Sequence, residues 1–513
     1  MFSIVTPVYN TDPDLLAEMV DSVVHQTERS WELLLVDDRS PSEATRAALG
    51  RLAPTDPRIR SIRREVNGRI SEATNTGVAA ASGEFVLLLD HDDTLVPHAL
   101  ARIAAELTAH PETDYLYTDE DKIAEDGSAL GEFRKPDWSP SRLLGQMYTS
   151  HASVVRRSVF ERVGLLRSGF DGSQDHDLVL RVVEVAREVR HVPEVLYRWR
   201  AVAGSTAIDV RAKDYAWDAG VRAVQDALDR RGLHATAGHG GLPGTYRLDW
   251  SQQDIGPVSV VVTIDGVQTT GGPLTDGTTS GVVDAVRSII DAAAGVELEF
   301  VVVHGQETPR AELDALEALG RPVVRVLADP RGAASAARNL GSAHASFPTL
   351  VFLDDTVRAR SDAFLHDLVG PLSRSGVGAT GAHSIDAEDR IRDAGFRYAL
   401  TPYRRPYTGR ALDDAGEGNA LYVDREVSAV ASNALAISAA TFRAVGGFNE
   451  DLSGDAADLD LGRKLTSTGL QSVWLAYARV QDLRSTLPAD PSDAELGILL
   501  ARWGDTADDP FIG

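Results

Sequence analysis

Residues 85–93, Phe-Val-Leu-Leu-Leu-Asp-His-Asp-Asp, join a continuous apolar run to a group of acids. Such a run predicts a strand that is buried on both faces of a sheet. Asp90 and Asp92 stand where this strand ends, so they are predicted to offer carboxylate oxygens at the rim of a cleft. Oxygen ligands of this kind suit Mg²⁺ or Mn²⁺ that bridges the phosphates of a bound molecule. The alternative is an Asp-rich turn, and this stretch alone does not decide between the two.

The chain before this stretch alternates between apolar runs and amphipathic runs. Strands are expected at residues 2–6, 31–36 and 59–62, and helices at residues 15–23, 43–52 and 73–81. This order predicts an α/β fold with a Rossmann-like, mainly parallel sheet flanked by helices. Ligands of such sheets bind beyond the carboxyl ends of the strands. Asn10, Asp38 and Asp90 follow three of these ends, so they mark the expected site.

The second half of the chain repeats the pattern of the first. Residues 338–345 are similar to 73–81, residues 350–356 to 87–92, and residues 446–461 to 164–178. Echoes in the same order indicate a tandem duplication. A Gly- and Pro-rich stretch at 239–244 marks the expected linker. The predicted organisation is a first domain at 1–235, a linker at 236–256, a second domain at 257–490 and a C-terminal tail at 491–513.

A second group of acids lies at residues 172–181, Gly-Ser-Gln-Asp-His-Asp-Leu-Val-Leu-Arg. The acids precede an amphipathic run, so Asp175 is expected near the N-terminus of a helix. One interpretation is a helix cap that accepts backbone N–H groups. The other is a general base, which the positive end of the helix dipole keeps ionised. The sequence leaves open how these roles divide between Asp175 and Asp177.

Composition limits the class of protein. The chain has 513 residues, 43% hydrophobic and 25% charged, which is typical of a soluble globular protein with two or three domains. Its net charge of −25 argues against nucleic acid as a partner. No run reaches the roughly 18 apolar residues of a membrane-spanning helix, and the N-terminus reads as a strand and not as a signal peptide. The absence of cysteine excludes disulfides and fits a cytoplasmic location, with peripheral association at the inner face of a membrane as a further option.

Five motifs together resemble, in order and spacing, those of family 2 glycosyltransferases with the GT-A fold. They are PVYN at 7–10, VDD at 36–38, NGRIS at 67–71 together with Asn75, LDHD at 89–92 and QDHD at 174–177. Further stretches resemble the branch that builds bacterial O-antigen and related surface polysaccharides of the cell envelope: YTDEDK at 117–122, KPDWSP at 135–140, FDGSQD at 170–175, LYRWR at 196–200 and GSTA at 204–207. The resemblance is strong over about residues 2–230 and weak beyond them.

The resemblance implies an inverting transfer from a nucleoside-diphosphate sugar to a hydroxyl of a glycan or lipid-linked glycan acceptor. It implies Asp175 as the base, Asp92 and Asp90 as ligands of Mg²⁺ or Mn²⁺, and a larger set of residues around the donor. The donor set is Pro7, Tyr9, Asn10, Asp38, Arg69, Asn75, Asp90, Arg198 and Arg200. Arg198 departs from the family, which often has His there; an arginine does not ligate a cation but binds phosphate oxygens bidentately. The candidate acceptor residues are Asp119, Glu120, Trp138, His151 and Gln174, although Trp138 is also expected as a packing residue and His151 as a structural histidine.

The second half keeps the order of predicted strands and helices but lacks the motifs that would bind the nucleotide and the metal. The first strand is followed by Thr263-Ile264-Asp265-Gly266, without Tyr-Asn, and Asp354-Asp355-Thr356 replaces the spaced acids. The prediction is a degenerate second domain that serves structure or acceptor binding.

Three other functions stay open at this point. One is a bifunctional polysaccharide polymerase with two active transferase domains. Another is a non-catalytic scaffold that binds sugar nucleotides or glycans. The third, a sugar-phosphate nucleotidyltransferase, lacks a Gly-rich phosphate loop after the first strand. The oligomeric state and the donor sugar are not set by the sequence.

Overall fold

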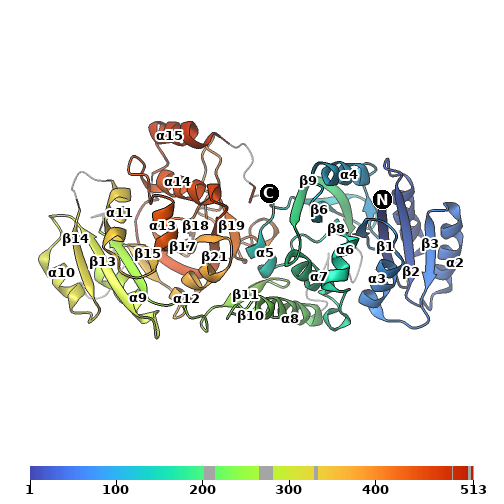
Figure 1. Cartoon of the computed structure of the whole chain (residues 1–513), viewed down its shortest axis with the longest axis horizontal. Helices are drawn as coiled ribbons and strands as arrows, with labels where there is room; N and C mark the ends of the chain where they lie inside the picture. Colours follow the sequence, from blue (N-terminus) through green and yellow to red (C-terminus); the bar gives the residue numbers. More distant parts are fainter. Residues whose placement is uncertain (202–213, 265–280, 329–332, 488, 506–509, 512–513) are drawn as a thin grey trace. The chain divides into compact units, whose positions relative to one another are not determined.

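The computed structural model describes residues 1–201, 214–264, 281–328, 333–487, 489–505 and 510–511 (Figure 1). The chain forms two compact units. The first contains Met1–Arg230 and Ala237–Tyr246, and the second contains Arg231–Thr236 and the chain from Arg247 onward. Two stretches quoted above, residues 204–207 and 265–266, lie outside the described residues.

The first unit alternates strands and helices along its N-terminal half, as the apolar pattern predicts. This half contains β1 Phe2–Val8, α1 Pro13–Val24, β2 Trp31–Asp37, α2 Glu43–Leu52, β3 Ile59–Arg63, α3 Arg69–Ala80, β4 Phe85–Leu88, β5 Thr94–Leu95 and α4 Ala99–Ala109. The rest contains β6 Thr113–Ile123, β7 Ala129–Phe133, α5 Pro140–Gly145, β8 Ser153–Arg156, α6 Arg157–Val163, α7 Gln174–Val183, β9 Glu188–Arg200 and α8 Asp214–Arg230. The predicted linker contains two short strands, β10 Thr236–His239 and β11 Tyr246–Asp249.

Within the described residues, the sheet of the first unit runs β3-β2-β1-β4-β8-β6-β9-β5, with β7 paired to β6. The strands β3, β2, β1 and β4 are parallel, whereas β8 is antiparallel to both β4 and β6. The carboxyl ends of the parallel strands therefore meet at one edge, where the polar residues after β1, β2 and β4 gather. This confirms the predicted α/β fold, with antiparallel strands added on one side.

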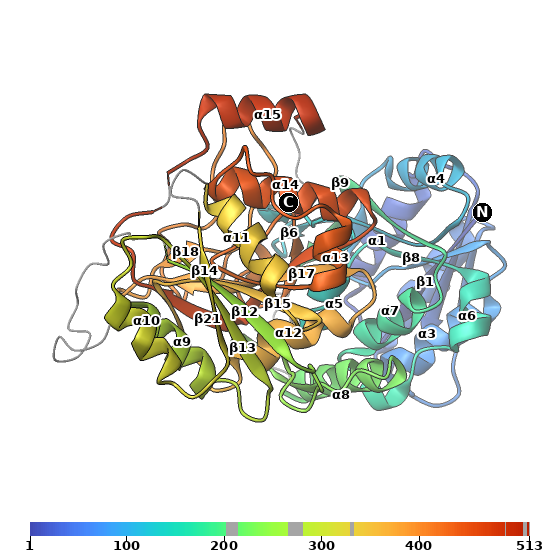
Figure 2. The ribbon, with the colours of Figure 1, turned by 60° about the vertical axis from the view of Figure 1, so that its left-hand side comes forward.

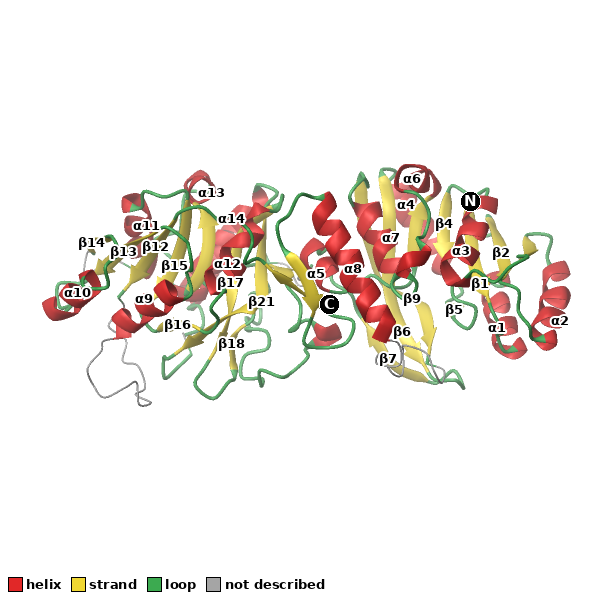
Figure 3. Cartoon of the chain, turned by 90° about the horizontal axis from the view of Figure 1, so that it is seen from below, coloured by secondary structure: helices red, strands yellow, loops and turns green. Residues whose placement is uncertain are grey.

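Both faces of this sheet are covered (Figure 3). Ile4 of β1 belongs to a buried cluster with Leu16 and Met19 of α1. Val5 points to the other face, where a Cβ added to Gly77 of α3 would lie 2.4 Å from its Cγ1 atom. Only a glycine lets α3 approach the strand this closely.

Within the described residues, the second unit repeats the plan with a sheet that runs β14-β13-β12-β15-β20-β17-β21-β16, with β18 and β19 attached to β17 and β21. Figure 2 shows helices α9 and α10 beside strands β12 and β13 of this sheet. Its first part contains β12 Val258–Thr263, α9 Gly281–Asp291, β13 Leu298–His304, α10 Arg310–Glu317, β14 Val323–Leu327, α11 Ala334–His344, β15 Thr349–Asp354, β16 Val357–Ala359 and α12 Phe364–Val369. Its second part contains β17 Val377–Ile385, β18 Ile391–Asp393, β19 Arg425–Val427, β20 Ala434–Ser438, α13 Ala439–Ala444, α14 Gly454–Ser467, β21 Gln471–Asp482 and α15 Asp493–Trp503. Helix α15 belongs to the predicted tail, yet Leu499 is part of the core of this unit and the Trp503 indole donates to Asp460.

The two units share buried polar details as well as an outline. The Glu32 carboxylate accepts hydrogen bonds from the Ser3 hydroxyl and from the amide and hydroxyl of Ser82. The same three-residue arrangement recurs in the second unit, at Ser259, Glu299 and Ser346.

A second detail recurs on the helices that follow the third strand of each unit. The side-chain amide of Asn75 donates to the backbone C=O of Leu166 and accepts from its N–H. The side-chain amide of Asn339 forms the same two hydrogen bonds with Phe448. Repetition at atomic detail supports the tandem duplication read from the sequence. Among the described residues no helix is long and apolar enough to cross a membrane.

Candidate active site

A cleft of about 1010 Å³ opens in the first unit at the carboxyl ends of β1, β2 and β4. Most of the residues predicted for the site line it: Pro7, Tyr9, Asp38, Arg69, Asp90, Asp92, His151, Gln174, Asp175 and Arg200. The cleft has the volume of a site for a ligand the size of a sugar nucleotide, at the upper end of the roughly 300–1,000 Å³ range of ligand pockets.

The acids after β4 differ in their exposure. The Asp90 side chain is 44% exposed and the Asp92 side chain 18% exposed. Asp93 is buried, and its carboxylate accepts hydrogen bonds from the Tyr197 hydroxyl (2.5 Å) and the Arg200 amide (2.7 Å). Burial raises the pKa of Asp93 to about 8, with a further contribution from the charge of Asp90. Burial also raises the pKa of Asp92, so both groups gain from a nearby positive charge.

Asp90 belongs to a group of side chains that offers ligand atoms for a divalent cation. Among the described residues, Asp90, Asp93 and His151 each offer a ligand atom, and these atoms lie within 4.8 Å of one another. Asp92 lines the same cleft but is not part of this group. Carboxylate oxygens are the donors that Mg²⁺ and Mn²⁺ prefer. The sequence pointed to Asp90 and Asp92, whereas the fold brings Asp93 and His151 to Asp90.

Glu120 holds His151 in place. Its carboxylate accepts from the His151 amide at 3.1 Å, lies 3.4 Å from His151 Nδ1, and pairs with the buried Lys135 ammonium at 2.9 Å. Burial lowers the pKa of His151, but hydrogen bonding to Glu120 and the charges of Glu120, Asp90 and Asp93 outweigh it and raise that pKa to about 9. Glu120 therefore acts on the site through His151, and it does not line the cleft.

Asp175 lies in the first turn of α7 and lines the cleft. The N-cap of this helix is Ser173, and among the described residues Asp175 Oδ1 accepts a hydrogen bond from the neighbouring His176 amide alone, at 2.8 Å. Asp177 is fully buried, and its carboxylate binds Arg181 at 2.8 Å and Arg167. The two acids are thus separated: Asp177 stabilises the fold, and Asp175 faces the cleft.

Three predicted donor residues lie at the far end of the cleft or beside it. The buried Asp38 carboxylate accepts from Arg64 at 2.5 Å and from the Gly68 amide at 2.9 Å. Tyr9 lines the cleft with its side chain 48% exposed. Asn10 does not line the cleft; it has a φ of 53°, and its amide oxygen accepts from the Ser42 amide.

Other predicted residues are engaged elsewhere. The Asn75 side chain hydrogen-bonds to the backbone of Leu166, as described above, and does not line the cleft. The partly exposed Arg198 lies 3.8 Å from Asp121. Arg200 does line the cleft, but its buried guanidinium donates to the carbonyl groups of Asp92 and Glu125 and to the Glu18 carboxylate. These contacts favour a structural role for Asn75 and Arg200.

Two of the predicted acceptor residues also lie outside the cleft lining. Asp119 is buried and accepts from the Lys135 amide at 2.8 Å, and it lies 2.9 Å from His191 Nε2. Trp138 is half-buried. Of the acceptor candidates, only His151 and Gln174 line the cleft.

The cleft also contains residues that the sequence did not assign to it. They are Val8, Asn67, Ile70, Ala73, His91, Met147, Ser150, Asp171, Gly172, Trp199 and Tyr215. Trp199 stands between His151, at 5.3 Å between ring centroids, and the Lys122 ammonium, at 4.8 Å. Trp199 belongs to the motif LYRWR at 196–200, and this motif is the feature of the sequence that could have predicted its place in the cleft.

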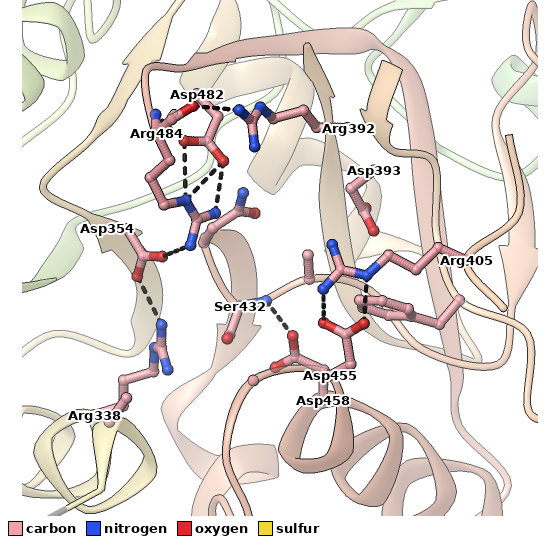
Figure 4. Close-up of a pocket in the computed structure, with 15 residues that line it drawn as sticks. Arg338, Asp354, Arg392, Asp393, Arg405, Ser432, Asp455, Asp458, Asp482 and Arg484 are labelled. Atoms are coloured by element: carbon pink, nitrogen blue, oxygen red, sulfur yellow. Dashed lines mark hydrogen bonds and ion pairs between the residues drawn. The ribbon is translucent and has the colours of Figure 1, made fainter. Parts of the chain in front are cut away.

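The corresponding edge of the second sheet is closed by arginines (Figure 4). The Asp354 carboxylate at the end of β15 binds Arg338 at 2.7 Å and lies 3.5 Å from Arg484, and its side chain is only 3% exposed. The cavity at this edge measures about 190 Å³. Here guanidinium groups pair with Asp354, the carboxylate that corresponds to Asp90 of the first unit. The cavity is also much smaller than the cleft of the first unit.

Comparison with known proteins agrees with the motifs. Residues 3–164 match the model of Glycosyl transferase family 2. The chain is 35% identical over 503 residues to the protein y4gI of Sinorhizobium fredii, covering 94% of this chain and 52% of that protein. It is 32% identical over 490 residues to the O-antigen biosynthesis protein RfbC of Myxococcus xanthus, covering 94% of this chain and 37% of that protein. The chain therefore spans about half or less of the length of these relatives.

A solved structure of S. aureus TarS 1-349 in complex with UDP-GlcNAc also aligns, with a TM-score of 0.36 and 17% identity, over 45% of this chain and 72% of that one.

Proposed function

We propose, from the match of residues 3–164 to the model of Glycosyl transferase family 2, that the protein is an inverting, metal-dependent glycosyltransferase. The donor is a nucleoside-diphosphate sugar, and the acceptor is a hydroxyl of a glycan or lipid-linked glycan, in the synthesis of a surface polysaccharide. The observation that carries this proposal is the cleft at the strand ends, which Asp90, Asp92 and Asp175 line together. The likeness to RfbC supports the choice of polysaccharide.

Asp175 is the general base in this proposal. Its carboxylate takes the proton of the acceptor hydroxyl while that oxygen forms a bond to the anomeric carbon. The bond between the anomeric carbon and the diphosphate oxygen breaks on the opposite side, so the configuration inverts. Asp175 lies in the first turn of α7 and lines the cleft, which places its carboxylate where an acceptor hydroxyl can reach it.

Asp90 and Asp92, with Asp93 and His151 beside them, would hold the divalent cation. When bound, the cation supplies positive charge to the departing diphosphate. Arg69 lies exposed in the cleft lining, and among the described residues no carboxylate pairs with it. It is therefore placed to bind phosphate oxygens bidentately.

Tyr9 and Asp38 are proposed to bind the nucleoside. The exposed Tyr9 ring offers a stacking surface for the base, and Asp38 lies at the end of the neighbouring strand. Pro7 and Gln174 complete the donor and acceptor ends of the cleft.

The second domain is proposed to have no transferase activity. Arg338 and Arg484 surround the Asp354 carboxylate, so a cation would have to displace two guanidinium groups. The experiment that tests the whole proposal is a screen of nucleoside-diphosphate sugars that measures release of the nucleoside diphosphate, with Mn²⁺ or Mg²⁺ and with a chelator. Release that needs no cation, or no release from any donor with an acceptor glycan present, would contradict it.

A further inference from the structure

The cavity at the edge of the second sheet is built from buried charged groups (Figure 4). Its wall contains four arginines and five aspartates among the described residues: Arg338, Arg392, Arg405, Arg484, Asp354, Asp393, Asp455, Asp458 and Asp482. The wall also contains the neutral polar residues Ser432 and Asn433 and four residues without a polar side chain: Ala334, Phe396, Ala431 and Gly454. A cluster of this kind is costly to bury unless its members are paired.

The arginines of this wall are paired within the protein. Arg405 forms a two-pronged ion pair with Asp455, and Arg484 forms one with Asp482. Arg338 binds Asp354, as described above, and Arg392 donates to two backbone carbonyl groups, those of Thr486 and Arg484. Each of the four guanidinium groups thus already has a partner within the protein, which does not favour binding of an anion such as a nucleoside diphosphate or a sugar acid.

Two polar atoms in the wall lack a partner among the described residues. Asp458 is 5% exposed; its Oδ2 atom accepts from the Ser432 amide at 3.1 Å, and its Oδ1 atom has no partner. The Nε atom of Arg392, which is 8% exposed, also has none. Buried polar atoms are rarely left without a hydrogen bond. Asp458 and Arg392 therefore line the cavity and keep unused hydrogen-bonding capacity, one as an acceptor and one as a donor, and Figure 4 shows the two residues on different sides of the cluster.

A hydroxyl group is both donor and acceptor, so a ligand with several hydroxyls matches such a wall. The volume of about 190 Å³ lies below the roughly 300 Å³ of the smallest pockets for drug-sized ligands. It exceeds the volume of a single water, about 30 Å³, several times. The space suits a group of monosaccharide size and is too small for a sugar nucleotide.

We propose that this cavity of the second domain binds one neutral sugar unit of a glycan, with Asp458 accepting from one of its hydroxyl groups. The inference goes beyond the proposed transfer, since it concerns a separate cavity and needs no cation. It gives the second domain a binding role where catalysis is absent.

The test uses the full chain and calorimetry or saturation-transfer NMR. The probes are neutral methyl glycosides of glucose, galactose, mannose, rhamnose and N-acetylglucosamine, with methyl glucuronide as the charged counterpart. At least one neutral glycoside should bind at millimolar concentration, and the glucuronide should bind more weakly. Binding should persist when UDP or GDP with Mn²⁺ fills the first cleft.

Three variants locate the site. Asp458→Asn removes the charged acceptor and should weaken binding about tenfold or more. Ala431→Leu adds bulk to the cavity wall without removing a charge and should abolish binding. Asp460→Asn is the matched control, because Asp460 is a buried aspartate of the same helix that does not line the cavity.

The proposal is overturned if no neutral glycoside binds, which would mean that the cavity holds only water. It is also overturned if binding survives Ala431→Leu or is displaced by the nucleotide. Thermal melting checks that each variant folds, and Ala431→Leu with the nucleotide competition decides the matter if Asp458→Asn does not fold. Failure of the donor screen leaves these results unaffected, so the two proposals fail separately.

Discussion

Asp175 and Asp177 stand two residues apart on the same helix turn, and the structure predicts opposite consequences for the same substitution. In Asp175→Asn, the amide oxygen can still accept from the His176 amide, so folding should change by no more than about 0.5 kcal/mol. The amide cannot accept a proton, so transfer should fall by about 10²- to 10⁴-fold, which is about 3–5 kcal/mol in the barrier. Donor binding should remain, because the substitution leaves the metal ligands intact.

Asp177→Asn should do the reverse. Asp177 is fully buried between Arg167 and Arg181, and removing one partner of a buried ion pair costs about 3–5 kcal/mol. For a domain of this size that corresponds to a fall in Tm of roughly 6–20 °C. Transfer per folded molecule should stay near that of the wild type.

The assay sets three measurements side by side for each variant: Tm, nucleoside-diphosphate affinity with Mn²⁺ by calorimetry, and the rate of sugar transfer below the melting transition. The reasoning is refuted if Asp175→Asn transfers at a near-normal rate, which would make this residue a structural group of the helix N-terminus. It is also refuted if folded Asp177→Asn has lost transfer while its Tm is unchanged.

Three further predictions concern charge. Asp92→Ala should abolish metal-dependent binding of UDP or GDP in calorimetry while the Tm stays near that of the wild type; full activity in excess chelator would contradict this. Asp354→Ala removes a buried carboxylate that pairs with Arg338, so the Tm should fall, yet the transfer rate per folded molecule should not change. Loss of one of two distinct sugar transfers in the folded variant would contradict this. Burial raises the pKa of Asp458 from 3.8 to about 7, against the opposing charge of Arg338. The folded protein therefore binds more protons than the unfolded chain between these pH values, and stability falls as pH rises through this window. Relative to wild type, Asp458→Asn should gain up to about 4 kcal/mol between pH 4 and pH 7 in urea unfolding; a pH-independent difference would contradict the assignment.

The sequence by itself determined the α/β fold and the position of the cleft. Apolar strand runs and amphipathic helix runs are local properties, and the order of strands and helices leaves few ways to cover both faces of a sheet. Residues that follow parallel strands must meet at one edge, so Asp38 and Asp90 were placed at the cleft without coordinates, whereas Asn10, predicted in the same way, does not line it. Asp175 was found because an acid before an amphipathic run lies at a helix N-terminus.

Tertiary structure alone decided which of these side chains act together. His151 and Asp93 converge on Asp90, and Glu120 reaches the site only through His151, because β6, β8 and the loop after β4 come together in the folded sheet. Asp93 is close to Asp90 in the chain, but His151 and Glu120 come from segments far from it, and no local pattern encodes their contacts.

Arg200 and Arg338 also show that the sequence does not reveal which side chains meet in the folded protein. The motif suggested that Arg200 binds the donor, but the fold commits its guanidinium to Asp92, Glu125 and Glu18. In the second domain the sequence revealed the absence of Tyr-Asn after the first strand and of the second spaced acid at Thr356. The fold shows that Arg338 comes from a separate helix to neutralise Asp354. Whether a buried carboxylate is open to a cation or already paired depends on which side chains surround it in space, and that is decided by packing and not by sequence position.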